Sequence, residues 1–120
     1  MNATTISQQQ NANTLGDIAT FLLVRQPAWS NWKYSNLINV VITANSKQLL
    51  YFTLTPWGDL QSVCVCAESN EKNTIEILQF SGIISDLRKM LAEFWKVYPT
   101  ITTATFYRNK RKVKFDLTRL

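Results

Sequence analysis

The sequence contains no histidine, and its 120 residues include only 3 glycines, 3 prolines and 2 cysteines. Histidine is a common general base and metal ligand near neutral pH, so any such role falls to other side chains. Cys64 and Cys66 alone are too few for a structural zinc site, and a disulfide between such near neighbours would be strained. We interpret them as two small side chains packed on one strand face, and we expect no metal and no cofactor.

Long apolar runs are also lacking. The longest, residues 37–44, is interrupted by Asn39 and Thr43, and it is far shorter than the roughly 20 residues that cross a membrane. Residues 1–13 are rich in Asn, Gln, Thr and Ser, without the basic start and apolar centre of a signal peptide. We therefore expect a cytoplasmic protein with no transmembrane segment. Residues 1–13 are expected to be a polar flexible tail and residues 14–120 a single domain.

Acidic residues are few, with 8 Asp and Glu against 13 Lys and Arg, for a net charge of +5. A basic protein is attracted to nucleic acid, an anionic membrane or an acidic protein, and charge alone does not choose among them. Much of the excess gathers near the C-terminus, at Arg108, Lys110, Arg111, Lys112, Lys114 and Arg119. This cluster suits phosphate binding, but it also suits a solvated strand face that prevents edge-to-edge pairing.

The residues that are present predict a globular domain, since 46% are apolar and 12% aromatic. Apolar spacing predicts a helix from Thr14 to about Arg25 and a second from about Ser35, for which the β-branched content leaves a strand possible. The remaining expected elements are strands 48–54, 60–67 and 74–80, a helix from Ser85 to Tyr98, and a hairpin of 101–107 with 112–117. The order α-α-β-β-β-α-β-β indicates an α/β (α+β) fold with a mixed sheet and helices on its faces.

This order resembles the GNAT acyltransferase fold, and specific residues resemble one family within it, the toxin-activating lysine acyltransferases. Those enzymes move a fatty acyl chain from acyl carrier protein to lysines of a pore-forming toxin. The matching segments, in order, are Leu15-Gly16-Asp17-Ile18, Gln26-Pro27-Ala28-Trp29-Ser30-Asn31-Trp32, Ile38-Asn39-Val40, Gln48 at the opening of a strand, and Cys64 in the return strand. The resemblance covers roughly residues 14–117.

The departures from the family matter more than the matches. The family's catalytic His falls on Trp29 and the adjacent Arg on Ser30, while the only acidic candidate for its catalytic Asp is Glu76. An indole cannot act as a base near neutral pH, and the family chemistry needs a group that takes a proton or accepts the acyl chain. Glu76 lies between Ile75 and Ile77, so it is either a catalytic carboxylate or simply an exposed one on the outer strand face.

Two further segments are candidate binding sites. Gln79-Phe80-Ser81-Gly82 partly resembles the Gln-x-x-Gly start of the GNAT cofactor loop, where Gly permits close backbone approach and helix N–H groups bind phosphate. A plain strand-to-helix turn explains the same residues. Trp29, Trp32 and Tyr34 could line an acyl or peptide groove, plug a site that active enzymes keep open, or pack in the core.

We therefore expect a toxin-activating-acyltransferase-like protein and favour a pseudoenzyme that binds acyl carrier protein over an active enzyme using Glu76. The alternative is a small basic accessory module of phage or plasmid type, which binds nucleic acid or a protein partner through residues 106–114. A homodimer formed through an edge strand near Ile101 is also compatible with the sequence.

Overall fold

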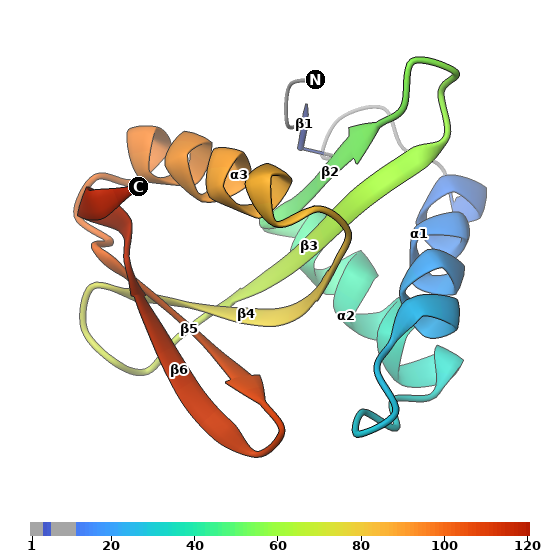
Figure 1. The fold of residues 1–120 in the computed structure, drawn as a ribbon, viewed down its shortest axis with the longest axis horizontal. Helices are drawn as coiled ribbons and strands as arrows, with labels where there is room; N and C mark the ends of the chain where they lie inside the picture. The colour runs from blue at the N-terminus through green and yellow to red at the C-terminus, as the bar shows by residue number, and fades with distance from the viewer. Residues whose placement is uncertain (1–3, 6–11) are drawn as a thin grey trace.

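The computed structural model describes residues 4–5 and 12–120. Its elements follow the expected order, with one short strand added at the front (Figure 1). In chain order they are β1 Thr4–Thr5, α1 Ala12–Arg25, α2 Tyr34–Ser46, β2 Leu50–Leu54, β3 Leu60–Glu68, β4 Thr74–Ser81, α3 Ile84–Val97, β5 Thr103–Arg108, β6 Arg111–Asp116 and the 3-10 helix η1 Leu117–Arg119. The α+β fold class and the mixed sheet are thereby confirmed.

The six strands lie in the order β1-β2-β3-β4-β5-β6, and every neighbouring pair is antiparallel except β4 with β5, which are parallel. The parallel pair follows from the connection, because a helix between two strands returns the chain to the same end of the sheet. The free long edge is β6, since β5 lies between β4 and β6. The edge expected near Ile101 is therefore wrong: Ile101 precedes β5, which is an interior strand.

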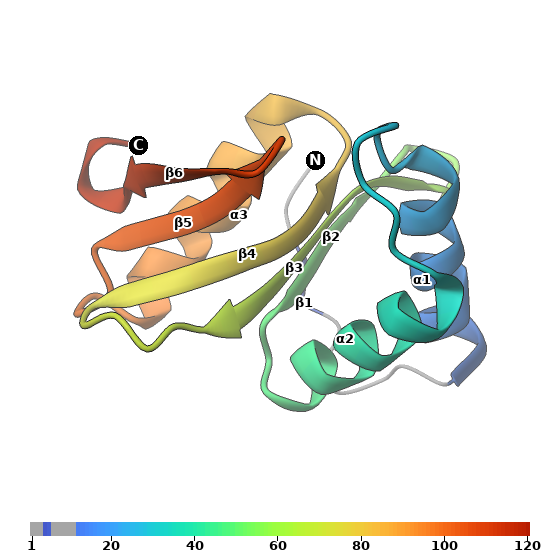
Figure 2. The ribbon, with the colours of Figure 1, turned by 90° about the horizontal axis from the view of Figure 1, so that it is seen from below.

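The helices cover both faces of the sheet. α3 lies on one face, while α1 and α2 lie on the other (Figures 1 and 2). On the α3 face, Tyr51 contacts Phe94 edge-on with ring centroids 6.4 Å apart, and Cys64 stands opposite Tyr51 in the strand register. Cys64 and Cys66 are both buried with their sulfur atoms 3.7 Å apart, which is the expected packing of alternate residues on one face.

α2 is a helix, and the alternative of a strand is wrong. Leu37, Val41 and Ala44 are buried at helical spacing against the sheet, so tertiary packing outweighs the β-branched composition. The Oδ1 of Asn36 accepts a hydrogen bond from the Lys33 N–H and closes the first turn. Gln48 does not open β2 as expected, because it has φ 59° in the turn before the strand.

Some predicted boundaries need correction at the N-terminus. α1 begins at Ala12 rather than Thr14, and Thr4–Thr5 pairs with Phe52 and Tyr51 although it lies in the expected polar tail. Residues 1–3 and 6–11 of that tail lie outside the described residues. Gly16 has a packing reason in α1, because a Cβ there would stand 3.3 Å from the hydroxyl oxygen of Tyr34 at the start of α2.

Candidate functional site at the divergence of β4 and β5

The sheet opens where its two parallel strands part. β4 and β5 pair only from Thr74 opposite Thr103 to Ile77 opposite Phe106, although β4 continues to Ser81 and β5 to Arg108. Figure 1 shows the two strands diverging beyond this point. Among the described residues, no strand therefore pairs with the β5-facing edge of residues 78–81, which leaves a stretch of extended backbone suited to pair with an incoming chain.

A β-bulge marks the start of the divergence. On the β3 side, Val65 stands opposite Gln79 and Cys66 opposite Ile77, so Leu78 has no counterpart. A bulge bends its strand and increases the local twist, which is why β4 turns away from β5 directly after Ile77. The bulge cannot be predicted from residue type, because Leu78 is an ordinary apolar residue for a strand.

A small hollow adjoins the bulge on the α2 side. Its volume is about 160 Å³, and it is lined by Asn39, Val40, Thr43, Ala44, Lys47, Cys66, Ala67 and Leu78. Most of these walls are apolar, and Lys47 contributes the one charged side chain of the lining. The hollow can take a few methylene or methyl groups, which makes it a candidate for the end of an apolar chain.

The loop between α1 and α2 is held by Gln26, a residue to which the sequence assigned no role beyond the family resemblance. Its Nε2 donates to the carbonyl of Trp32 at 2.8 Å, and its Oε1 accepts from the Trp32 N–H at 3.1 Å. The Ser30 hydroxyl donates to the same Oε1 at 2.9 Å. One side chain thus spans the loop that carries the two tryptophans.

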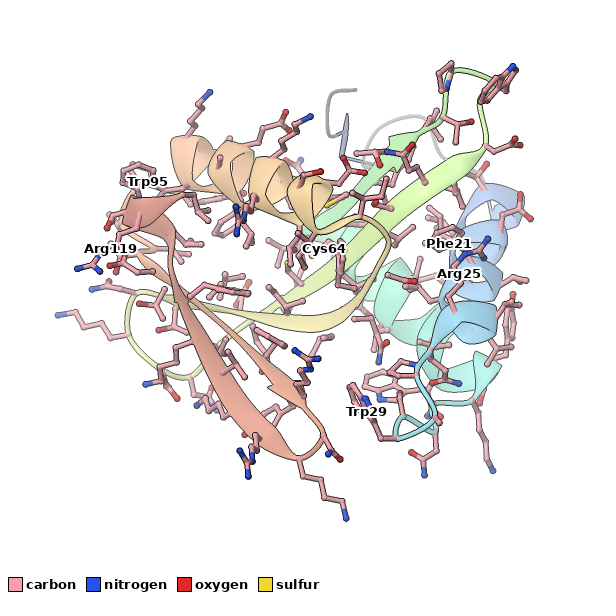
Figure 3. All side chains as sticks on the ribbon, in the orientation of Figure 1. Phe21, Arg25, Trp29, Cys64, Trp95 and Arg119 are labelled. Carbon is pink, nitrogen blue, oxygen red and sulfur yellow. The ribbon has the colours of Figure 1, made fainter. Side chains whose placement is uncertain are left out.

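The two tryptophans of this loop have different environments. Trp32 is half-buried and packs against the core, as the packing interpretation expected. Trp29 is 52% exposed and lies on the side of the loop nearest the β5–β6 hairpin (Figure 3). Figures 1 and 2 both place this loop beside the tip of that hairpin. The indole of Trp29 is therefore free to contact a ligand.

Five members of the expected basic cluster lie on the hairpin and form two groups, while the sixth, Arg119, lies in η1 and pairs with Asp116. Lys112 forms an ion pair with Glu71, and the Nζ of Lys114 lies 3.7 Å from the other carboxylate oxygen of Glu71. The hydrogen bond from Lys112 lowers the pKa of Glu71, and the same bond raises the pKa of Lys112. These two lysines attach the β3–β4 connection to β6, whereas Arg108, Lys110 and Arg111 at the tip form no ion pair with any residue in 12–120.

Glu76 lies on β4 within the segment still paired to β5. It is half-buried between Ala67 of β3 and Thr105 of β5, and its neighbours Ile75 and Ile77 are buried on the other face. The carboxylate therefore faces away from Ile75 and Ile77, as expected. It is one of the charges that raise the pKa of Lys112, behind Glu71.

Gly82, at the β4–α3 turn, approaches β3 closely. A Cβ built there would lie 2.1 Å from Ser62 Oγ and 2.5 Å from Ser62 Cα, and the residue has φ +137°. The glycine is thus required by packing of the turn against Ser62, whatever the turn binds. Gln79 precedes it on the strand segment that has left β5, and Ile83 and Ile84 after it are exposed.

A buried carboxylate at the start of α3 was not recognised from the sequence beyond its helix position. The Oδ2 of Asp86 accepts hydrogen bonds from Thr53 Oγ1 at 2.8 Å, Gln61 Nε2 at 2.9 Å and Ser62 Oγ at 2.7 Å. Burial acts to raise the pKa of Asp86, but these three hydrogen bonds outweigh it, and the net pKa is lowered. Ser62 Oγ also accepts from the Ile83 N–H, so β2, β3 and α3 are joined at one point.

This carboxylate affects the phosphate-binding interpretation of the Gly82 turn. A free anion at the N-terminus of α3 would meet the negative charge of Asp86, which already occupies the favourable end of the helix dipole. The first turn of α3 is therefore better suited to hold the sheet than to bind a second anion. The remaining feature at this end of β4 is the unpaired backbone edge of residues 78–81.

Comparison with known proteins adds no assignment: no family model matches the sequence, and no curated protein matches it. Within residues 4–5 and 12–120, no helix has the length and apolar character needed to cross a membrane. In the same part of the chain, no group of three or more His, Cys, Asp or Glu residues is placed to hold a metal ion.

Proposed function

We propose that this protein is a GNAT-like relative of the toxin-activating lysine acyltransferases that binds an acylated carrier protein and does not transfer the acyl chain itself. The observation that carries the proposal is the divergence of β4 and β5 after only four paired residues. The prosthetic arm of a carrier protein is an extended chain of amides. Such a chain is suited to pair with the unpaired backbone edge of residues 78–81.

The residues around this edge support the same proposal. The hollow beside Leu78 offers apolar walls of Val40 and Ala44 to the end of an acyl chain. The exposed indole of Trp29 offers a further apolar surface across the opening. The net charge of +5 suits an acidic carrier protein.

The lack of acyl transfer in this proposal rests on the absent base. Trp29 has no group that accepts a proton near neutral pH, and the chain has no histidine to replace it. Glu76, the remaining candidate, lies in the paired part of β4 and not in the segment that opens. Binding without turnover is the activity that these residues support.

Native mass spectrometry of the protein mixed with acyl carrier protein tests the proposal. We expect a complex with the acylated carrier that is at least tenfold more populated than the complex with the unacylated carrier. Trp29→Ala should reduce this preference, whereas Trp57→Ala, at an indole 85% exposed on the β2–β3 turn, should leave it unchanged. Equal binding of both carrier forms would show that the interaction depends on charge and not on the acyl chain. No complex at low salt would refute the proposed binding of acyl carrier protein.

A gain-of-function variant tests the catalytic part separately. Trp29→His restores the family's residue at its position, and it is preferable to a double change with Ser30→Arg because Ser30 bonds to Gln26. If the site otherwise survives, the variant should show slow transfer of the acyl chain to a lysine peptide. Acyl transfer by the unmodified protein at a comparable rate would contradict the pseudoenzyme interpretation.

A further inference from the structure

The tip of the β5–β6 hairpin carries positive charge in an arrangement that lowers its own stability. Arg108 and Arg111 stand directly opposite each other in the strand register, and like charges in such pairs repel. Asn109 and Lys110 between them have φ 50° and 68°. Glycine is the residue that takes this left-handed conformation without cost, and at the second turn position a lysine stands instead.

Nothing in the described part of the chain compensates this charge. The ion pairs found in residues 12–120 join Lys112 and Lys114 to Glu71 and Arg119 to Asp116. Arg108, Lys110 and Arg111 have no acidic partner there, and all three are exposed. Three unpaired cations within four residues, held by a tight turn, form a compact site for a polyanion.

Exposed aromatic rings border the same tip. Tyr107 is 56% exposed on the hairpin face opposite to Arg108 and Arg111, and Trp29 is 52% exposed on the neighbouring α1–α2 loop (Figure 3). A strand bound at the tip therefore passes from the cations on one face to the rings on the other. Single-stranded nucleic acid is bound by this combination, with cations along the phosphates and aromatic rings stacked on bases. The carboxylates of an acidic protein would pair with the cations but would not stack on the rings, as the bases of a single strand do. The combination therefore favours nucleic acid over protein at this tip.

We propose that the hairpin tip and the adjacent aromatic loop bind single-stranded nucleic acid without sequence preference, with phosphates at Arg108, Lys110 and Arg111 and bases stacked on Tyr107 and Trp29. The proposal does not depend on the binding of a carrier protein at β4. It excludes Lys112 and Lys114 from the primary contacts, because Glu71 occupies them.

Fluorescence anisotropy with a labelled single-stranded oligothymidine, measured over a range of salt concentrations, tests this site. We expect binding that weakens with salt, with a slope about 2 units shallower in the triple variant Arg108→Gln, Lys110→Gln, Arg111→Gln, because three phosphate contacts are lost. The matched control Arg88→Gln, Lys89→Gln, Lys96→Gln removes the same charge from the exposed surface of α3 and should keep the slope. Trp29→Ala should weaken binding by roughly fivefold or more.

The melting temperature of the hairpin variant shows whether the variant is still folded. Removing the opposed charges of Arg108 and Arg111 should leave the melting temperature of the hairpin variant unchanged or raised, so weaker binding cannot be attributed to unfolding. Equal loss in both triple variants would overturn the site and leave only net charge. Binding of acyl carrier protein but not of oligothymidine at the tip would also overturn the site. The same holds if the protein binds a duplex as tightly as the single strand and Trp29→Ala has no effect on binding.

Discussion

Gly82 illustrates, at the residue scale, how a packing requirement and a backbone conformation combine. Its φ of +137° is rarely adopted by other residues, and the space for a Cβ is already filled by Ser62. Gly58 in the β2–β3 turn also has a positive φ, of +88°, but has nothing within 4 Å of a built Cβ. Substitution of Gly58 therefore tests backbone strain alone, whereas substitution of Gly82 tests strain together with a steric clash.

We predict that Gly82→Ala lowers the free energy of unfolding by at least about 3 kcal/mol, because the clash adds to the strain. Gly58→Ala, which meets strain alone, should cost about 1 kcal/mol. Urea unfolding followed by circular dichroism measures both. Equal losses in the two variants would show that the contact with Ser62 is not rigid.

Lys110 has a left-handed backbone conformation that glycine adopts at lower cost. Lys110→Gly should raise the free energy of unfolding by about 0.5–1 kcal/mol, since glycine suits the second position of this tight turn. Val113→Gly, within β6, should lower it, because glycine weakens a strand and offers no side chain to pack. Thermal unfolding of the two variants gives the comparison. A destabilised Lys110→Gly would mean that the lysine is held by contacts absent from this structure.

At the scale of elements, Asp86 connects α3 to the sheet. Asp86→Asn should lower the free energy of unfolding by about 2–4 kcal/mol, because the three hydrogen bonds to one oxygen are stronger with a charged carboxylate than with a neutral amide. Denaturant unfolding at neutral pH measures this loss. Gln61→Ala removes one of the three donors and should cost less, so a reversed order of the two variants would contradict the central role assigned to the carboxylate.

The same carboxylate gives a signed pH dependence. The folded pKa of Asp86 is lowered below its ordinary value of 3.8, so its contribution is fully present above that value and is lost as pH falls through the lowered folded pKa. We expect the wild-type protein to lose stability between about pH 4 and pH 2 more steeply than Asp86→Asn. Parallel stability curves for the two proteins in this range would refute the assignment.

The loop between α1 and α2 depends on one side chain in a comparable way. Gln26→Ala removes three hydrogen bonds and should loosen the loop that carries Trp29, while Ser30→Ala removes only one of them. Hydrogen exchange of the Trp32 amide should rise at least tenfold in Gln26→Ala and change little in Ser30→Ala. Unchanged protection of Trp32 in both variants would mean that packing, not Gln26, holds the loop.

Across the whole molecule, Glu71 pairs with Lys112 and Lys114 and leaves the other basic residues of the hairpin unpaired within residues 12–120. Glu71→Gln should leave the melting temperature nearly unchanged, because the ion pairs it makes are exposed. It releases Lys112 and Lys114 beside the hairpin tip and raises the net charge from +5 to +6, since one negative charge is removed. Oligothymidine should therefore bind more tightly at low salt, as measured by anisotropy, and unchanged affinity would place the binding site elsewhere.

Sequence and structure contribute different parts of this description. Apolar periodicity and turn residues such as Pro56 and Gly58 are local signals, so they determine the order and type of the elements along the chain. The absence of histidine is likewise a property of the sequence alone, and it assigns any general-base role near neutral pH to other side chains.

The tertiary structure decides which of these residues meet. Asp86 finds Thr53, Gln61 and Ser62 only after β2, β3 and α3 assemble, and the bulge at Leu78 appears only in the register with β3. Within one basic cluster, Glu71 engages two lysines and leaves the tip free, because the β3–β4 connection returns to β6. Contacts between residues far apart in the chain depend on register and packing, which local propensity does not encode.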